Sequence, residues 1–178
     1  MKNVLIITTS LRLGSNSDML AESFKAGAES SGNNVEVISL KNKTINFCKG
    51  CFACQKLGHC VINDDANEIT DKMANADVIV WATPTYYYEM SGQMKTMIDR
   101  ANSLFSRERN FKDVYVLITS DDTDSSTPDA IIKGISGWIK CMKGSRLAGS
   151  VFVGGIEEEG AIEGNIGLEK AFELGKGV

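Results

Sequence analysis

The chain has 178 residues, 43% of them hydrophobic, and it carries a net charge of −4 with an isoelectric point near 5.1. These values predict a single domain, residues 1–178, with a core large enough to fold without disulfides, and the acidic balance argues against nucleic acids and anionic membranes as partners. No apolar run approaches the ~20 residues of a membrane span, and the N-terminal apolar run is too short for a secretory signal, so we expect a cytoplasmic protein.

Five short apolar runs predict five strands, at residues 4–7, 35–40, 78–82, 114–118 and 147–153. The first, third and fourth runs are continuously apolar, which is typical of parallel strands covered on both faces. The second run alternates between apolar and polar residues and suits an edge strand.

Helical patterns lie between the strands. The first predicted helix ends near Ser31-Gly32, and the others start near Asp65, near Met90, at Thr127-Pro128 and near residue 162. Regular alternation of strand and helix predicts an α/β fold, an open parallel sheet with helices on both faces. Ligands of such sheets bind outside the carboxyl ends of the strands, where the loops after strands one, three and four should meet.

The loop between the first strand and the first helix carries many groups that bind anions. Residues 9–17 read Thr-Ser-Leu-Arg-Leu-Gly-Ser-Asn-Ser. The first N–H groups of a helix have no partner within it, and the helix dipole adds partial positive charge there. One residue would suffice to cap the helix, whereas this loop offers three hydroxyls, an amide and a guanidinium, from Ser10, Ser15, Ser17, Asn16 and Arg12. We therefore predict a phosphate-binding loop. It lacks the dinucleotide and triphosphate fingerprints, so the ligand should be smaller.

Two further loops are expected at the same edge. Residues 83–88 read Thr-Pro-Thr-Tyr-Tyr-Tyr, and aromatic faces beside a phosphate site suit a flat ring system. The alternative is that one or two of the tyrosines pack on the neighbouring helix. Residues 120–126, Ser-Asp-Asp-Thr-Asp-Ser-Ser, either bond the polar edge of such a ring or form an acidic surface loop.

Three motifs resemble those of one family. Residues 10–17 are similar to the Ser-x-Arg-x-x-Ser/Gly-Asn-Ser/Thr phosphate loop of the flavodoxin-like NAD(P)H-dependent FMN reductases. Residues 83–87 resemble their Pro-x-Tyr loop, and residues 92–100 resemble the helix that follows it. The resemblance covers nearly the whole chain, and its one departure is Leu11, where relatives often have proline.

The resemblance implies a flavodoxin-like three-layer sandwich with a five-stranded parallel sheet of order 2-1-3-4-5, and FMN as the cofactor. It implies that the FMN phosphate is held by Ser10, Arg12, Ser15, Asn16 and Ser17. It implies that the ring is lined by Pro84, Thr85, Tyr86 and Tyr87, and we assign the ring's polar edge to Ser120 and Asp121. Lys95, Asp99 and Arg100 are interpreted as structural, the first two at the spacing of a helix ion pair.

Four cysteines lie in a loop at about residues 44–63 with the spacing C-x2-C-x2-C-x5-C: Cys48, Cys51, Cys54 and Cys60. The spacing is similar to the compact motif of iron–sulfur flavoproteins, a branch of the same family. Four thiolates this close can hold a [4Fe-4S] cluster. The alternatives are zinc, with His59 as a spare ligand, and free or redox-labile thiols. The fifth cysteine, Cys141, is interpreted as a small apolar residue of a helix.

The leading hypothesis is an FMN-dependent oxidoreductase that passes electrons from NAD(P)H through the flavin to a small-molecule or protein acceptor. Because no separate nicotinamide domain is expected, NAD(P)H would stack over the exposed flavin, and a second subunit would wall the site in a homodimer or homotetramer. No catalytic acid or base is predicted. The alternatives are an iron–sulfur flavoprotein that acts as an electron carrier, and a flavin-free binding or redox-sensing module that uses the cysteines.

Overall fold

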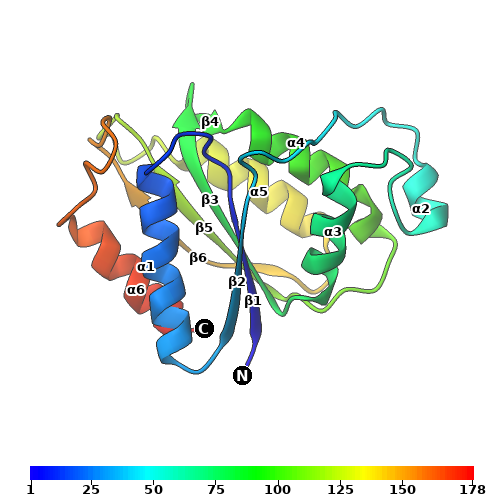
Figure 1. Ribbon diagram of the computed structural model, residues 1–178, viewed down its shortest axis with the longest axis horizontal. Coiled ribbons are helices and arrows are strands. Elements are labelled where there is room, and N and C mark those ends of the chain that lie inside the picture. Colours follow the sequence, from blue (N-terminus) through cyan, green and yellow to red (C-terminus); the bar gives the residue numbers. More distant parts are fainter.

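The computed structural model describes all 178 residues. They fold into one sheet with helices on both faces (Figure 1). The elements follow in chain order as β1 Asn3–Thr8, α1 Asn16–Ser30, β2 Asn34–Ser39, α2 Ala53–Leu57, α3 Asp65–Asn75, β3 Val78–Tyr86, β4 Glu89–Met90, α4 Gly92–Arg100, the 3-10 helix η1 Ala101–Phe105, β5 Asp113–Thr119, α5 Asp129–Cys141, β6 Arg146–Val153 and α6 Ile166–Lys176.

The sheet confirms the predicted topology. Its five parallel strands run in the order β2-β1-β3-β5-β6, which is the order 2-1-3-4-5 that the family resemblance implies for the five predicted strands. The sixth strand, β4, has two residues and pairs antiparallel with the end of β3. The prediction of five strands was therefore too low by this one short strand, which no apolar run in the sequence indicates.

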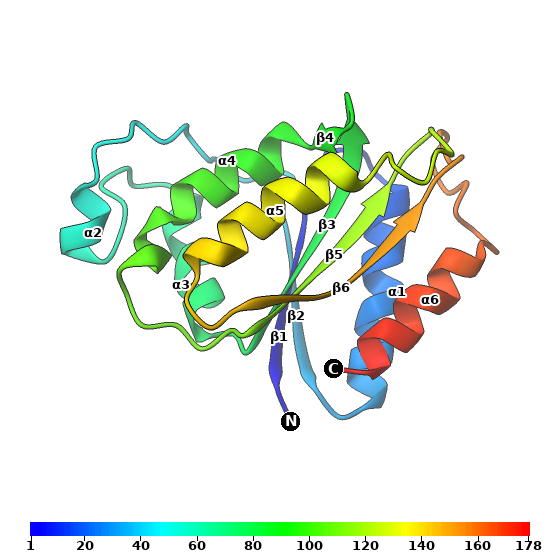
Figure 2. The ribbon, with the colours of Figure 1, turned by 180° about the vertical axis from the view of Figure 1, so that it is seen from behind.

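Two separate hydrophobic cores make the three layers. Alternate residues of β1 face opposite sides: Val4 and Ile6 pack under α1 and α6, while Leu5 and Ile7 pack under the helices of the other face. Figures 1 and 2 show α1 and α6 covering one face and α3, α4 and α5 covering the other. Both faces of the central strands are thus buried, which explains their continuously apolar sequences.

Helices α1 and α6 pack closely because glycines stand at their crossing. A Cβ atom on Gly27 would lie 2.0 Å from the carbonyl oxygen of Phe172, and one on Gly175 would lie 2.0 Å from that of Phe24. No other residue type fits at these positions without moving a backbone. This packing fixes α1, whose N-terminus faces the candidate site.

The segment after the third strand differs from the loop that was predicted. Strand β3 continues to Tyr86, and Tyr87 and Tyr88 form a two-residue turn with φ angles of 49° and 64°. Both central residues of the tightest hairpin turns have positive φ, so the chain reverses here and returns as β4. Helix α4 consequently begins at Gly92 rather than near Met90, and the Ser91 hydroxyl caps it.

Helix α3 begins at Asp65, as predicted, whereas α5 begins at Asp129, just after the predicted Thr127-Pro128, and α6 begins at Ile166 rather than near residue 162. The side chain of Asp64, not Asp65, caps α3 by accepting from the Ala66 N–H. Thr127 does not cap α5, because its hydroxyl donates to Asp122 instead. None of the helices is long and apolar enough to cross a membrane.

Candidate functional site

A pocket of about 250 Å³ opens at the carboxyl ends of β1, β3, β5 and β6. Ten of the eleven residues predicted for the cofactor site line it: Ser10, Arg12, Ser15, Asn16, Ser17, Pro84, Thr85, Tyr86, Ser120 and Asp121. Tyr87 is the one that does not, since its side chain is fully exposed at the tip of the hairpin. The pocket's other residues are Thr119, Ile156, Glu157 and Glu159.

The first wall is the loop from Ser10 to Ser17, which leads into α1. Ser15 caps the helix by accepting from the Asp18 N–H, while the N–H groups of Asn16 and Ser17 donate to no protein acceptor. These free donors stand where the helix dipole is positive, as an anion site requires. Arg12 is the only cation among the residues that line the pocket.

Asn16 has a different role from the one expected of its amide. Its Nδ2 donates to the carbonyl oxygens of Ile156 and Glu158, at 3.4 and 2.8 Å, and its Oδ1 accepts from the Ile162 N–H at 3.2 Å. The side chain therefore fastens the loop that follows β6. This loop forms the fourth wall of the pocket, and Arg12 Nη1 also donates to it, at the Glu157 carbonyl oxygen.

The sequence prediction missed this fourth wall. The only sequence signal for this wall was its position, since its residues follow the last strand at the same edge of the sheet as the three predicted loops. It also missed a buried hydroxyl network that holds two of those loops together. Ser91 Oγ donates to Thr9 Oγ1 at 2.9 Å, and the Ser91 N–H donates to Thr83 Oγ1 at 3.1 Å.

The wall contributed by β3 combines the aromatic ring of Tyr86 with the hydroxyl of Thr85, which lacks a hydrogen-bond partner. Tyr86 lines the pocket and is 46% exposed. The Thr85 Oγ1 atom beside it is buried and has no hydrogen-bond partner in the protein. Tyr88 turns away towards the loop after β5, where the nearby Asp122 carboxylate raises the pKa of its hydroxyl.

The loop after β5 combines the two interpretations, since part of it faces the pocket and the rest forms an acidic surface loop. Ser120 and Asp121 line the pocket. Asp122 and Asp124 instead bond the loop's own groups, accepting from the Asp124 N–H and the Ser126 N–H, at 3.0 and 2.8 Å. Its first two residues are thus available to a ligand, and the others hold its shape.

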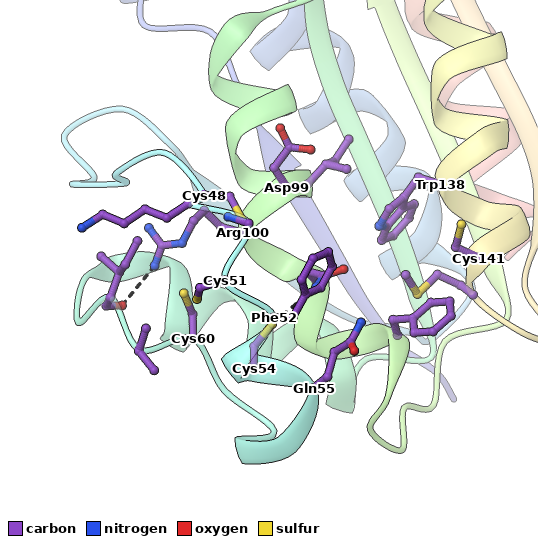
Figure 3. Close-up of a pocket in the computed structure, with 18 residues that line it drawn as sticks. Cys48, Cys51, Phe52, Cys54, Gln55, Cys60, Asp99, Arg100, Trp138 and Cys141 are labelled. Carbon is purple, nitrogen blue, oxygen red and sulfur yellow. Dashed lines mark hydrogen bonds between the residues drawn. The ribbon is translucent and has the colours of Figure 1, made fainter.

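The cysteine loop borders a second, larger pocket of about 560 Å³ (Figure 3). Cys48, Cys51, Cys54 and Cys60 all line it, and none of the chain's cysteines is in a disulfide. Cys54 is buried in α2, a short helix that was not predicted. No three His, Cys, Asp or Glu side chains lie close enough together to hold a metal ion. Figure 3 shows Cys141 and Trp138 on the opposite wall, so the interpretation of Cys141 as a packed apolar residue was wrong: it is exposed.

A comparison with models of known protein families identifies the family of this chain. Residues 2–127 match the family model of the NADPH-dependent FMN reductases. The chain belongs to this family. The resemblance of the three motifs to this family is confirmed.

Individual proteins are also similar to this chain. An iron-sulfur flavoprotein of Methanosarcina thermophila is 28% identical over 173 residues, which cover 96% of this chain and 90% of that protein. One of Archaeoglobus fulgidus is 39% identical over 100 residues, 56% of this chain, and the match spans only 45% of its length. Among solved structures, the NAD(P)H:quinone oxidoreductase of Methanothermobacter marburgensis superposes with a TM-score of 0.77 at 16% identity, covering 98% of this chain and 94% of that one. This last likeness supports the flavodoxin-like fold alone.

The pocket residues fit the cofactor that the FMN reductase family implies. Free N–H groups and Arg12 are suited to a phosphate, and the orphaned Thr85 hydroxyl beside Tyr86 is suited to a polar atom of a flat ring. These groups would otherwise leave hydrogen-bonding capacity unused.

The cysteine loop fits a metal centre by the chemistry of its donors. The four free thiols of the motif line one pocket, with Cys141 on its opposite wall, and the buried Nε of Arg100, which also lines this pocket, has no hydrogen-bond partner. A donor of this kind suits thiolate or sulfide as an acceptor. Binding would require the thiols to draw closer together.

Proposed function

We propose that this chain binds FMN in the pocket at the carboxyl edge of the sheet and catalyses electron transfer from NAD(P)H to an acceptor. One observation carries the proposal: ten residues from three separate loops, predicted from sequence to bind FMN, line a single pocket. Bound FMN would supply the chemistry, by taking hydride from a nicotinamide and passing electrons on.

The role of the protein is to bind and orient the flavin. Arg12 and the N–H groups of Asn16 and Ser17 would neutralise the phosphate. Thr85 and Tyr86 would position the ring, and the oxygens of Ser120 and Asp121 would accept from its polar edge. No residue of the pocket is assigned the role of catalytic acid or base.

The nicotinamide is proposed to stack on the open side of the flavin. The tip of the β3–β4 hairpin is largely exposed, with Tyr87 fully so. A second subunit would wall this side, so we propose a homodimer or homotetramer. The acceptor is a small molecule or a redox protein.

A second function rests on the cysteine loop. We propose that Cys48, Cys51, Cys54 and Cys60 hold a [4Fe-4S] cluster, which would exchange single electrons with a partner. The observations that support it are the four free thiols of the motif, which line one pocket, and the similarity to the iron-sulfur flavoproteins of Methanosarcina thermophila and Archaeoglobus fulgidus.

Replacing any one of these four cysteines with serine should abolish the cluster and leave FMN bound, because the two pockets share no residues. Iron, acid-labile sulfide and flavin should be measured on protein made and kept without oxygen. Cys141→Ser is the control, because Cys141 faces the same pocket from the opposite wall but lies outside the four-cysteine motif, and it should change none of the three. Wild-type protein with neither iron nor sulfide would defeat the cluster and leave a flavin reductase with a cysteine-rich loop.

Tyr86→Leu should brighten the emission of bound FMN. A stacked aromatic ring quenches flavin fluorescence, and it contributes about 0.5–1.5 kcal/mol beyond the area it buries. Tyr87→Leu is the control, because Tyr87 stands outside the pocket. Equal brightness of both variants and the wild type would make Tyr86 a packing residue.

A further inference from the structure

Arg100, the last residue of α4, is a buried cation with an unusual set of partners. Its side chain has no exposed surface, and that of Asp64 is 3% exposed. The two form a forked pair: Nη1 donates to Asp64 Oδ2 at 2.6 Å and Nη2 donates to Oδ1 at 2.8 Å. Such two-point pairs are stronger and more directional than single hydrogen bonds.

The remaining bonds of Arg100 reach both ends of the cysteine motif. Nη1 donates to the carbonyl oxygen of Asn46 at 2.7 Å, and Nη2 donates to that of Ile62 at 3.0 Å. Asn46 lies two residues before Cys48, and Ile62 lies two residues after Cys60. One guanidinium therefore closes the loop that carries all four thiols.

Asp64 strengthens the same closure from the other side. Its Oδ2 accepts from the N–H and from the Nδ2 of Asn46, at 2.9 and 3.0 Å. Holding the two ends together removes the loop-closure part of the entropy that a free loop of this length would lose on ordering. The thiols can then share one pocket although little apolar packing holds the loop itself, in which Phe47 and Phe52 are exposed.

Arg100 also faces the thiols. It lines the cysteine pocket together with the four thiols, and its buried Nε has no hydrogen-bond partner. A buried guanidinium N–H that lacks a partner in this wall is suited to donate to sulfur.

We propose that Arg100 is the positioning residue of the cysteine site: locked by Asp64, it ties Asn46 to Ile62 and so holds the loop that carries the four thiols along one pocket. The role in loop closure stands on the contacts alone. The role towards a metal rests on the metal site proposed above.

The test compares Arg100→Gln with Lys95→Gln in the full-length protein. Lys95 is a matched control, an exposed cation on the same helix that pairs with Asp99. Hydrogen exchange should be followed at the bonded amides of Asn46, Gln55 and Gly58. We expect at least about tenfold faster exchange at these amides in Arg100→Gln, with unchanged exchange in β1, β3 and β5, since local opening involves only the segment that has lost its contacts.

A zinc titration of the reduced, metal-free protein supplies the second readout. Partners that orient metal ligands typically contribute about 10–100-fold in affinity, and we expect Arg100→Gln to lose that much while Lys95→Gln keeps the wild-type value. Should Arg100→Gln fail to fold, Arg100→Lys replaces it, because lysine keeps the charge but not the fork and should give a smaller loss of the same kind.

The proposal is overturned if a folded Arg100 variant shows wild-type exchange at Asn46, Gln55 and Gly58 and zinc affinity within about twofold of the wild type, well under the 10–100-fold expected. If the wild type binds neither zinc nor iron, the proposed metal site fails, and the exchange measurement alone decides the role of Arg100.

Discussion

Asp64→Asn should lower the free energy of unfolding by about 3–5 kcal/mol at neutral pH, the usual cost of removing one partner from a buried ion pair. Asparagine has nearly the same shape as aspartate and is an equally good N-cap, so α3 should keep its start. What the variant loses is the negative charge. Arg100, whose side chain is wholly buried, would then lack a counter-ion.

The effect should depend on pH in a defined direction. Burial alone would raise the pKa of Asp64, but the Arg100 guanidinium and the amide donors of Asn46 and Ala66 outweigh it and lower that pKa. A carboxyl whose pKa is lower in the folded chain contributes stability that is complete above its unfolded value, about 3.9, and that is lost as the pH falls below it. The difference between wild type and Asp64→Asn should therefore be constant from pH 7 to about pH 5 and shrink below about pH 4.

Urea denaturation at a series of pH values measures this difference. Asp99→Asn is the matched control, because it breaks an exposed ion pair with Lys95 on α4 and should cost no more than about 0.5 kcal/mol. Equal stability losses in the two variants, or a loss at Asp64 that does not diminish in acid, would show that the buried pair contributes little.

Arg12→Ala should weaken FMN binding by about ten- to a hundredfold. A charge-assisted hydrogen bond contributes about 1.5–3 kcal/mol, and each 1.4 kcal/mol is a factor of ten. The pocket sharpens this expectation, because Arg12 is its only cation while Asp121, Glu157 and Glu159 stand around it. Without Arg12, the phosphate would enter a pocket lined only by acidic and neutral side chains.

Fluorescence titration with FMN gives the dissociation constants. Lys25→Ala changes the net charge equally but lies on α1 outside the pocket, in an ion pair with Glu22, and should bind FMN as the wild type does. Arg12→Lys should fall between the two, because a lysine keeps the charge and loses the fork. A wild-type dissociation constant for Arg12→Ala would remove Arg12 from the site.

The parts of the fold that could be predicted are those whose signal is local. Strand β1 reads as buried because Val4, Leu5, Ile6 and Ile7 are consecutive and apolar, and the loop after it is recognisable because its anion-binding groups are consecutive too. The hairpin at Tyr87 and Tyr88 was missed because two tyrosines with positive φ are uncommon and carry no turn signature.

The parts that could not be predicted depend on residues far apart in the sequence. Asp64 and Arg100 are 36 residues apart, and nothing local marks either as a buried charge. Asn16 was expected to bind phosphate through its amide, yet the structure uses that amide to hold residues 156–162, about 140 positions further along. Residue types indicated that the loop was polar, but only the fold decides which partner each polar group meets.

The central claim is that this chain is an FMN-dependent enzyme that draws electrons from a nicotinamide. Its most direct test is an anaerobic titration of the FMN-loaded protein with NADH and, separately, NADPH, followed by the visible absorption of the flavin. We expect at least one nucleotide to bleach the flavin band stoichiometrically without any other protein present. Bound FMN that stays oxidised with both nucleotides, or a purified chain that does not retain FMN, would contradict it.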